Sequence, residues 1–168
     1  NESHLAAIDQ EHFKLTYLST VYEGDLEDAL EALGREAVDA VKQGAQILVL
    51  DDSGLVDSNG FAMPMLLAIS HVHQLLIKAD LRMSTSLVAK SGETREVHHV
   101  ACLLAYGANA IVPYLAQRTV EQLILTEWLQ GTVVDNVKTY TDVLSEGVIK
   151  VMAKMGISTV QSYQGAQI

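Results

Sequence analysis

The stretch Gly44-Ala45-Gln46-Ile47-Leu48-Val49-Leu50-Asp51-Asp52 decides the fold class of this chain. Its apolar centre, Ile47–Leu50, shows no alternation of apolar and polar residues, which is typical of a strand buried on both faces of a parallel sheet. Just before it, residues 25–43 repeat apolar side chains at three- and four-residue spacing, the pattern of an amphipathic helix. Asp25 suits the N-cap of this helix, and Gly44 suits the left-handed residue that ends it. A helix followed at once by a buried strand indicates an α/β fold.

The same alternation continues along the chain and predicts a parallel sheet. We expect strands at 15–21, 47–50, 84–88, 110–112 and 157–160, and helices at 25–43, 64–79, 94–106, 117–129 and 135–155. Strands joined by single helices run parallel through right-handed crossovers. Two architectures fit: a flavodoxin-like open sheet in three layers, or a partial barrel of consecutive β/α units, because 168 residues are too few for a complete eight-fold barrel.

Composition limits the function classes. The 11 Lys and Arg residues face 21 Asp and Glu residues, for a net charge of −10, and no basic run occurs, so we expect no nucleic-acid partner. Cys102 is the only cysteine, which excludes an intrachain disulfide and a zinc site of the paired-cysteine type. Neither a signal-peptide core nor an apolar run of about 18 residues occurs, so we expect a cytoplasmic protein without a membrane partner.

The length of 168 residues suits a single domain over 1–168. The chain begins at Asn1 instead of a methionine, and it ends at Gln167-Ile168 without a polar tail. We interpret these ends as cut points, so that the domain is a piece of a longer multidomain chain.

Polar residues follow the expected strands, at the edge of a parallel sheet where chemistry is usually found. They are Asp51-Asp52-Ser53, Lys90-Ser91, Pro113-Tyr114 and Gln161-Ser162-Tyr163. Asp51 and Asp52 form a carboxylate pair of the kind that can hold Mg²⁺. An acidic pair at this place is more often a solvated turn or the cap of the segment that follows, and we favour that interpretation.

Lys90 is a candidate amine nucleophile, because a lysine at a strand end can form a Schiff base. Such a lysine must be desolvated, whereas Glu93 and Glu96 nearby would keep this ammonium charged. Ser91 or Thr94 more simply caps the helix that follows. We therefore favour a structural role for the segment.

The helix at 94–106 carries a polar face with two histidines and the cysteine. Val97, Val100, Ala101 and Leu104 mark its core side, which places Arg95, His98, His99 and Cys102 together on the opposite side. His98 and Cys102 are four residues apart, so the cluster is a candidate metal site. One helix face lacks the second element that normally completes a tetrahedron, and we favour an interface with another domain.

Residue chemistry alone names no reaction, since no P-loop, dinucleotide fingerprint, nucleophile elbow or H-E-x-x-H motif occurs. Ordered blocks of sequence nevertheless resemble a known family. The blocks are Ile47–Asp52, Met63–Ala68, Val72–Ile77, Leu81-Arg82, Ser91–His99, Tyr106–Ala110, Pro113–Ala116, Lys150–Thr159 and Ser162–Gln167. Together they are similar to the large subunit of glutamate synthase, in the C-terminal part of the central domain that lies between its glutamine amidotransferase and FMN-binding synthase domains.

This resemblance implies part of an enzyme that makes L-glutamate from L-glutamine and 2-oxoglutarate, with NADPH or ferredoxin as electron donor. FMN and an iron–sulfur cluster are implied for the complete enzyme and none for this segment, which is expected to be inactive alone and to hold no metal. Its implied partners are the other domains of the same chain, which it would link while lining an ammonia tunnel. The expected tunnel or interdomain contacts are Lys90, Ser91, Arg95, His98, His99, Tyr114, Gln161, Ser162 and Tyr163. Asp52 and Val112 depart from the family pattern, which usually has arginine and asparagine there.

Two other functions fit the residues without the resemblance. One is a free-standing small α/β enzyme that uses Asp51, Asp52 and Lys90. The other is a metal-binding regulatory domain built on His98, His99 and Cys102.

Overall fold

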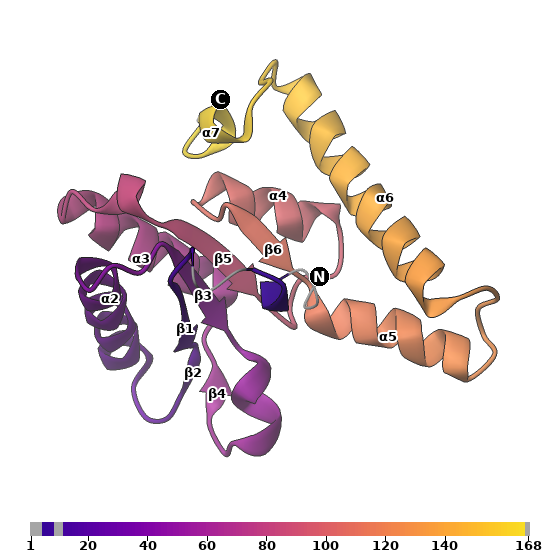
Figure 1. The fold of residues 1–168 in the computed structure, drawn as a ribbon, viewed down its shortest axis with the longest axis horizontal. Helices are drawn as coiled ribbons and strands as arrows, with labels where there is room; N and C mark the ends of the chain where they lie inside the picture. The colour runs from indigo at the N-terminus through magenta and orange to yellow at the C-terminus, as the bar shows by residue number, and fades with distance from the viewer. Residues whose placement is uncertain (1–4, 9–11, 167–168) are drawn as a thin grey trace.

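A parallel sheet of four strands forms the centre of the molecule (Figure 1), in a computed structural model that describes residues 5–8 and 12–166. Its strands are β1 (Leu15–Ser19), β3 (Ile47–Asp51), β5 (Ser86–Lys90) and β6 (Ala110–Val112). They lie side by side in chain order, β1-β3-β5-β6, and every pairing is parallel. A doubly wound sheet would reverse direction at a switch point. The unbroken order is that of consecutive β/α units, so the prediction of a parallel α/β fold is confirmed in its barrel-like form.

The helices follow the strands as predicted, with boundaries moved by a few residues. They are α2 (Leu26–Lys42), α3 (Met65–Lys78), α4 (Val97–Ala105), α5 (Tyr114–Leu125) and α6 (Val133–Lys154). A short helix that was not predicted, α7 (Val160–Tyr163), and 3₁₀ turns at Ser53–Asp57 and Arg82–Ser84 complete the set. Strands β2 (Val21–Tyr22) and β4 (Phe61–Ala62) pair antiparallel and form a second, two-stranded sheet. Asp25 caps α2 by accepting hydrogen bonds from Glu27 N and Asp28 N, as expected. None of the helices within the described ranges is long and apolar enough to cross a membrane.

The strand predicted at 157–160 is wrong. Gly156 takes the left-handed conformation, with φ of 70°, and ends α6. The chain then turns back, with Ile157 N donating to Met152 O at 2.9 Å, and Thr159 caps the short helix α7. Within residues 5–8 and 12–166 no strand pairs with this run, and Ile157 and Val160 pack against α4 and α6.

The sheet buries both of its faces. On one face, Leu18, Leu48, Leu50, Leu87 and Ala89 pack against α2, α3 and Leu103 of α4. On the other face, Val49, Val88, Val112 and Tyr114 meet Leu5 of the segment 5–8. The parallel register aligns Ser19, Asp51, Lys90 and Val112 across the four strands, at their C-terminal ends. Asp51 and Lys90 are therefore neighbours on adjacent strands.

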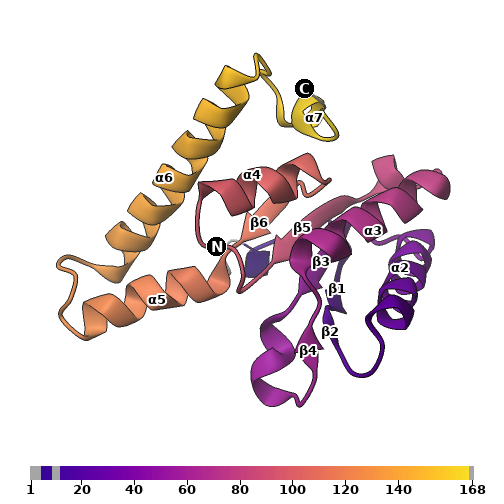
Figure 2. The same ribbon diagram turned by 180° about the vertical axis from the view of Figure 1, so that it is seen from behind.

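Helices α5 and α6 form a hairpin at one end of the sheet. Helix α5 leaves directly after β6, and α6 returns to cover α4 (Figures 1 and 2). The returning helix is anchored by Leu144, Val148 and Met152, which are buried near its C-terminal half. The turn between the two helices stands away from the sheet in both views.

Candidate functional site

Lys90 and Asp51 form an ion pair at the C-terminal edge of the sheet. The Lys90 Nζ atom lies 3.0 Å from Asp51 Oδ2 and 2.9 Å from Ser53 Oγ, and 5.5 Å from the centre of the Tyr114 ring. The side chains of the pair are only 14% and 17% exposed. Asp51 is thus a direct carboxylate partner of this ammonium, on the neighbouring strand. A charged, paired ammonium is a poor nucleophile, which disfavours the free-standing enzyme.

Asp52 is buried, with 3% of its surface exposed, so the expectation of a solvated turn is wrong for this residue. Its neighbour Asp51 accepts a hydrogen bond from Ser53 N at 2.8 Å, at the start of the 3₁₀ turn that follows. The Asp52 carboxylate accepts hydrogen bonds from Ser91 Oγ at 2.9 Å and from Gly92 N at 3.0 and 3.1 Å. These bonds join the end of β3 to the loop after β5. Asp52 therefore has a polar role at the very position that departs from the family pattern.

Tyr114 completes this strand-end network from the first residue of α5. Burial raises the pKa of its phenol, and a hydrogen bond with Asp52 and the charges of Asp52 and Asp51 raise it further. The phenol is consequently neutral at physiological pH, as a hydrogen-bonding group between two carboxylates should be. The structure thus brings together three predicted residues, Lys90, Ser91 and Tyr114.

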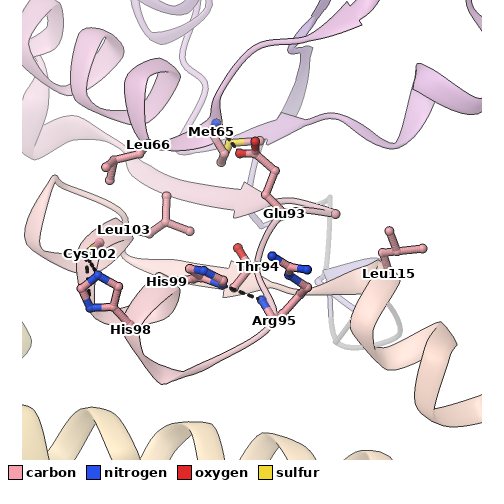
Figure 3. A pocket seen from close by; sticks show the side chains of 11 residues that line it. Met65, Leu66, Glu93, Thr94, Arg95, His98, His99, Cys102, Leu103 and Leu115 are labelled. Atoms are coloured by element: carbon pink, nitrogen blue, oxygen red, sulfur yellow. Dashed lines mark hydrogen bonds between the residues drawn. The ribbon is translucent and has the colours of Figure 1, made fainter.

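A pocket of about 520 Å³ opens next to this network, between the start of α3, the loop before α4 and the start of α5 (Figure 3). It is lined by Met65, Leu66, Gly92, Glu93, Thr94, Arg95, His98, His99, Cys102, Leu103 and Leu115. Leucine and methionine side chains form the apolar part of the wall, and the loop before α4 and the polar face of α4 form the rest. His98 and His99 reach the cavity from α4, whereas Arg95, expected on the same helix, reaches it from the loop before α4.

The two pocket histidines make different contacts. His98 lies against Cys102, with its Nε2 atom 3.7 Å from Sγ. The His99 Nδ1 atom accepts a hydrogen bond from Arg95 N at 3.1 Å, and its Nε2 atom lies 3.6 Å from a Glu96 carboxylate oxygen. This bond occupies the Nδ1 lone pair of His99. Across the described residues, no group of three or more His, Cys, Asp or Glu side chains is placed to hold a metal ion, so the geometry gives the metal-binding alternative no support.

Glu93 has a role that its sequence neighbours did not reveal. Its carboxylate accepts a hydrogen bond from Met65 N at 2.9 Å, at the N-terminus of α3. Pro64 at the N-cap has no side-chain oxygen to do this, so the loop after β5 supplies the cap. Glu96 is the N-cap residue of α4 and makes no side-chain capping bond, and the expectation that Ser91 or Thr94 would cap this helix is wrong.

The whole chain, residues 1–168, matches the sequence profile of the glutamate synthase central domain. The chain belongs to this family. It is 43% identical over 164 residues to the glutamate synthase [NADPH] large chain of Bacillus subtilis (strain 168), covering 98% of this chain and 11% of that one. It is 38% identical over 185 residues to ferredoxin-dependent glutamate synthase 2 of Synechocystis sp. (strain ATCC 27184 / PCC 6803 / Kazusa), covering 100% of this chain and 12% of that one. This central-domain chain thus spans about a ninth of the length of these relatives.

Solved structures share its fold. A flavocytochrome b2 double mutant (A198G:L230A) with sulfite bound superimposes with a TM-score of 0.62 at 14% sequence identity, covering 84% of this chain and 38% of that one. The same mutant with pyruvate bound gives a TM-score of 0.57 over 78% of this chain. At this identity the likeness shows the α/β fold alone.

A second polar network of the central domain was missed by sequence reasoning. The Arg82 guanidinium donates to His73 Nδ1 at 2.8 Å, to Thr85 O at 2.9 Å and to Gly107 O at 2.8 Å. It also donates to Asn109 Oδ1 at 2.9 Å. Burial, and secondarily the Arg82 charge, lowers the pKa of His73. Leu81-Arg82 and the Gly-Ala-Asn stretch were signals available in the sequence, but nothing in it showed that they meet.

The three predicted residues near the C-terminus lie apart from the strand-end network. Gln161, Ser162 and Tyr163 belong to α7 and not to a strand end, because the strand expected before them does not form. Tyr163 is buried against α4 with Ala101 and Leu104. Gln161 lines a separate cavity with Arg82. Their placement is that of a segment packed onto α4.

Proposed function

We propose that this chain is the C-terminal part of a glutamate synthase central domain, and that it connects the glutaminase and synthase sites of the complete enzyme and forms part of the wall of the ammonia path between them. Family membership supports a place within a longer enzyme, since the relatives are glutamate synthases and this chain matches about a ninth of their length. The complete protein would make L-glutamate from L-glutamine and 2-oxoglutarate. The other domains of the same chain would be the partners of this segment.

The observation that carries this proposal is the pairing of the strand-end groups beside an open pocket. Lys90, Asp51 and Asp52 are each bound by neighbouring side chains or backbone, so the groups best suited to catalysis serve to fix the loops. A sheet edge whose charged groups are all bound in this way suits the wall of a passage better than a reaction centre. The predicted contact residues Arg95, His98 and His99 line the pocket that this edge supports.

The pocket lining has no excess of one charge that would hold an ion. The Arg95 guanidinium and the Glu93 carboxylate both line it, and the Lys90 ammonium in the network behind Gly92 is paired with Asp51. Leu66, Leu103 and Leu115 add an apolar wall that offers ammonia no strong binding site.

The residues of this segment do not fit the cofactors of the complete enzyme. Iron–sulfur clusters need several cysteine ligands, and Cys102 is the only cysteine here. The N-terminus of α4 would be the natural place for a flavin phosphate, but Glu93 and Glu96 surround it with negative charge. FMN and the cluster would therefore belong to other domains.

Blocking the pocket tests the proposal in the full-length large chain. We expect Cys102→Trp, which fills the pocket from α4, to raise the free ammonia released per glutamate formed at least several-fold. Glutamate synthesis from added ammonia should persist, because that substrate does not need the path. Met83→Trp is the matched control, since Met83 is 97% exposed and lines a different cavity, the one that Arg82 and Gln161 also line. Unchanged ammonia release by Cys102→Trp would contradict the proposed path.

A further inference from the structure

The turn of the α5–α6 hairpin exposes a cluster of apolar side chains, which we call the hairpin tip. Its members are Leu123, Leu125, Trp128, Leu129 and Val134. Trp128, the only tryptophan of the chain, is 81% exposed. Figures 1 and 2 show this turn at the outer end of the hairpin, away from the sheet. Clustered exposed apolar residues with a central tryptophan are typical of an interaction site.

The hairpin tip is held in shape before any partner binds. Trp128 N and Leu129 N both donate to Leu123 O, at 2.9 and 3.1 Å. Across the turn, the side chain of Asn136 donates to the Gln130 and Thr132 carbonyl oxygens, each at 3.0 Å. Because these bonds fix the backbone around the tryptophan, docking would cost little further ordering.

The charged side chains of the segment that forms the tip, residues 119–137, are all acidic. Glu121, Glu127 and Asp135 lie in the segment 119–137, which contains no lysine or arginine, and all three are exposed. Of the basic residues just outside it, Arg118 lies 5.6 Å from the Tyr114 ring centre and Lys138 pairs with Asp142. A complementary surface therefore needs an apolar pocket with a basic rim.

The net charge of this chain and the length of its relatives indicate which partner binds the hairpin tip. Two copies of the tip would bring six carboxylates together on chains that each carry a net charge of −10, which opposes self-association. About nine tenths of each matched relative lies outside the region matched by this chain, so further domains are available. Resting on the proposed function, we propose that the hairpin tip docks Trp128 into an apolar pocket rimmed by lysine or arginine on another domain of the same long chain.

Zero-length carbodiimide cross-linking of the full-length large chain, with peptide mapping, tests this docking. We expect Glu121, Glu127 or Asp135 to be joined to lysines outside this segment. Mixing ¹⁴N- and ¹⁵N-labelled enzyme separates links within one chain from links between copies. Cross-links found only between two copies of the enzyme would show that the partner is not a domain of the same chain. Cross-links confined to these 168 residues would refute docking onto another domain.

Hydroxyl-radical footprinting of the same enzyme gives the second measurement. Trp128 should be oxidised at least tenfold more slowly in native than in denatured enzyme, whereas the exposed Met83 should differ little. Trp128→Ala should raise hydrogen exchange of the segment 119–137 about tenfold, and Met83→Ala should not. Equal oxidation of Trp128 in both states would refute the docking. The ammonia-release assay of Cys102→Trp reports on the pocket instead, so either proposal can fail while the other stands.

Discussion

Replacing Asp52 by alanine should destabilise this chain by about 3 kcal/mol. The carboxylate is 3% exposed and accepts hydrogen bonds from Ser91 Oγ and Gly92 N, and it also bonds the Tyr114 phenol. Alanine would leave three donors without their acceptor, and we assign about 1 kcal/mol to each, at the low end for buried unpaired groups because Gly92 is partly exposed. For a chain of this length the loss corresponds to a melting temperature lower by roughly 6–12 °C.

Urea and thermal unfolding of the 168-residue chain, followed by circular dichroism, would measure this loss. Asp39→Ala is the matched control, since Asp39 is an exposed aspartate within α2, and its effect should stay within about 0.5 kcal/mol. Asp52→Asn should lie between the control and Asp52→Ala, because its amide oxygen keeps one acceptor. An Asp52→Ala variant as stable as the control would refute the argument that this carboxylate holds the strand ends together.

Three further outcomes follow from single positions. Glu127→Gly should stabilise the chain by about 1 kcal/mol in urea unfolding, since Glu127 has a φ of 60° and a side chain disfavours that conformation; equal or lower stability would contradict this. Gly107→Ala should cost roughly 2 kcal/mol or more, because φ is 116° and the new Cβ would lie 2.3 Å from His73 Nδ1; a neutral variant would mean that the ring moves away freely. Stability should fall as pH rises above about 10, where Tyr114 ionises only in the unfolded chain, since its folded pKa is raised; Tyr114→Phe should remove that part of the slope.

The sequence predicted those parts of the fold that depend on local pattern. Ile47–Leu50 and the helix before it were recognisable because a buried strand and an amphipathic helix have different periods. The four-residue run Ile157–Val160 is too short to show a period, and in the structure Thr159 within it caps α7 instead of pairing with a strand. Short apolar runs of this kind depend on tertiary context.

The candidate site was predictable only in part, for a similar reason. Helical spacing was enough to place His98 and His99 near each other on α4, and both line the pocket, whereas Arg95 lines it from the loop before the helix. Nothing local distinguishes Asp51 from Asp52, although one pairs with Lys90 and the other is buried beneath the next loop. Their environments are set by a segment about forty residues away in the chain, as the sequence separation of the Asp52 hydrogen bonds shows.

Isotope retention in the full-length enzyme tests the central claim, a connecting wall along an ammonia path, most directly. The enzyme would be supplied with glutamine labelled with ¹⁵N at the amide and with excess unlabelled ammonium, and the ¹⁵N content of newly made glutamate would be measured. We predict nearly complete retention of ¹⁵N in the unmodified enzyme and in Met83→Trp, and strong dilution in Cys102→Trp. Equal retention in Cys102→Trp and the control, at comparable glutaminase rates, would contradict the account.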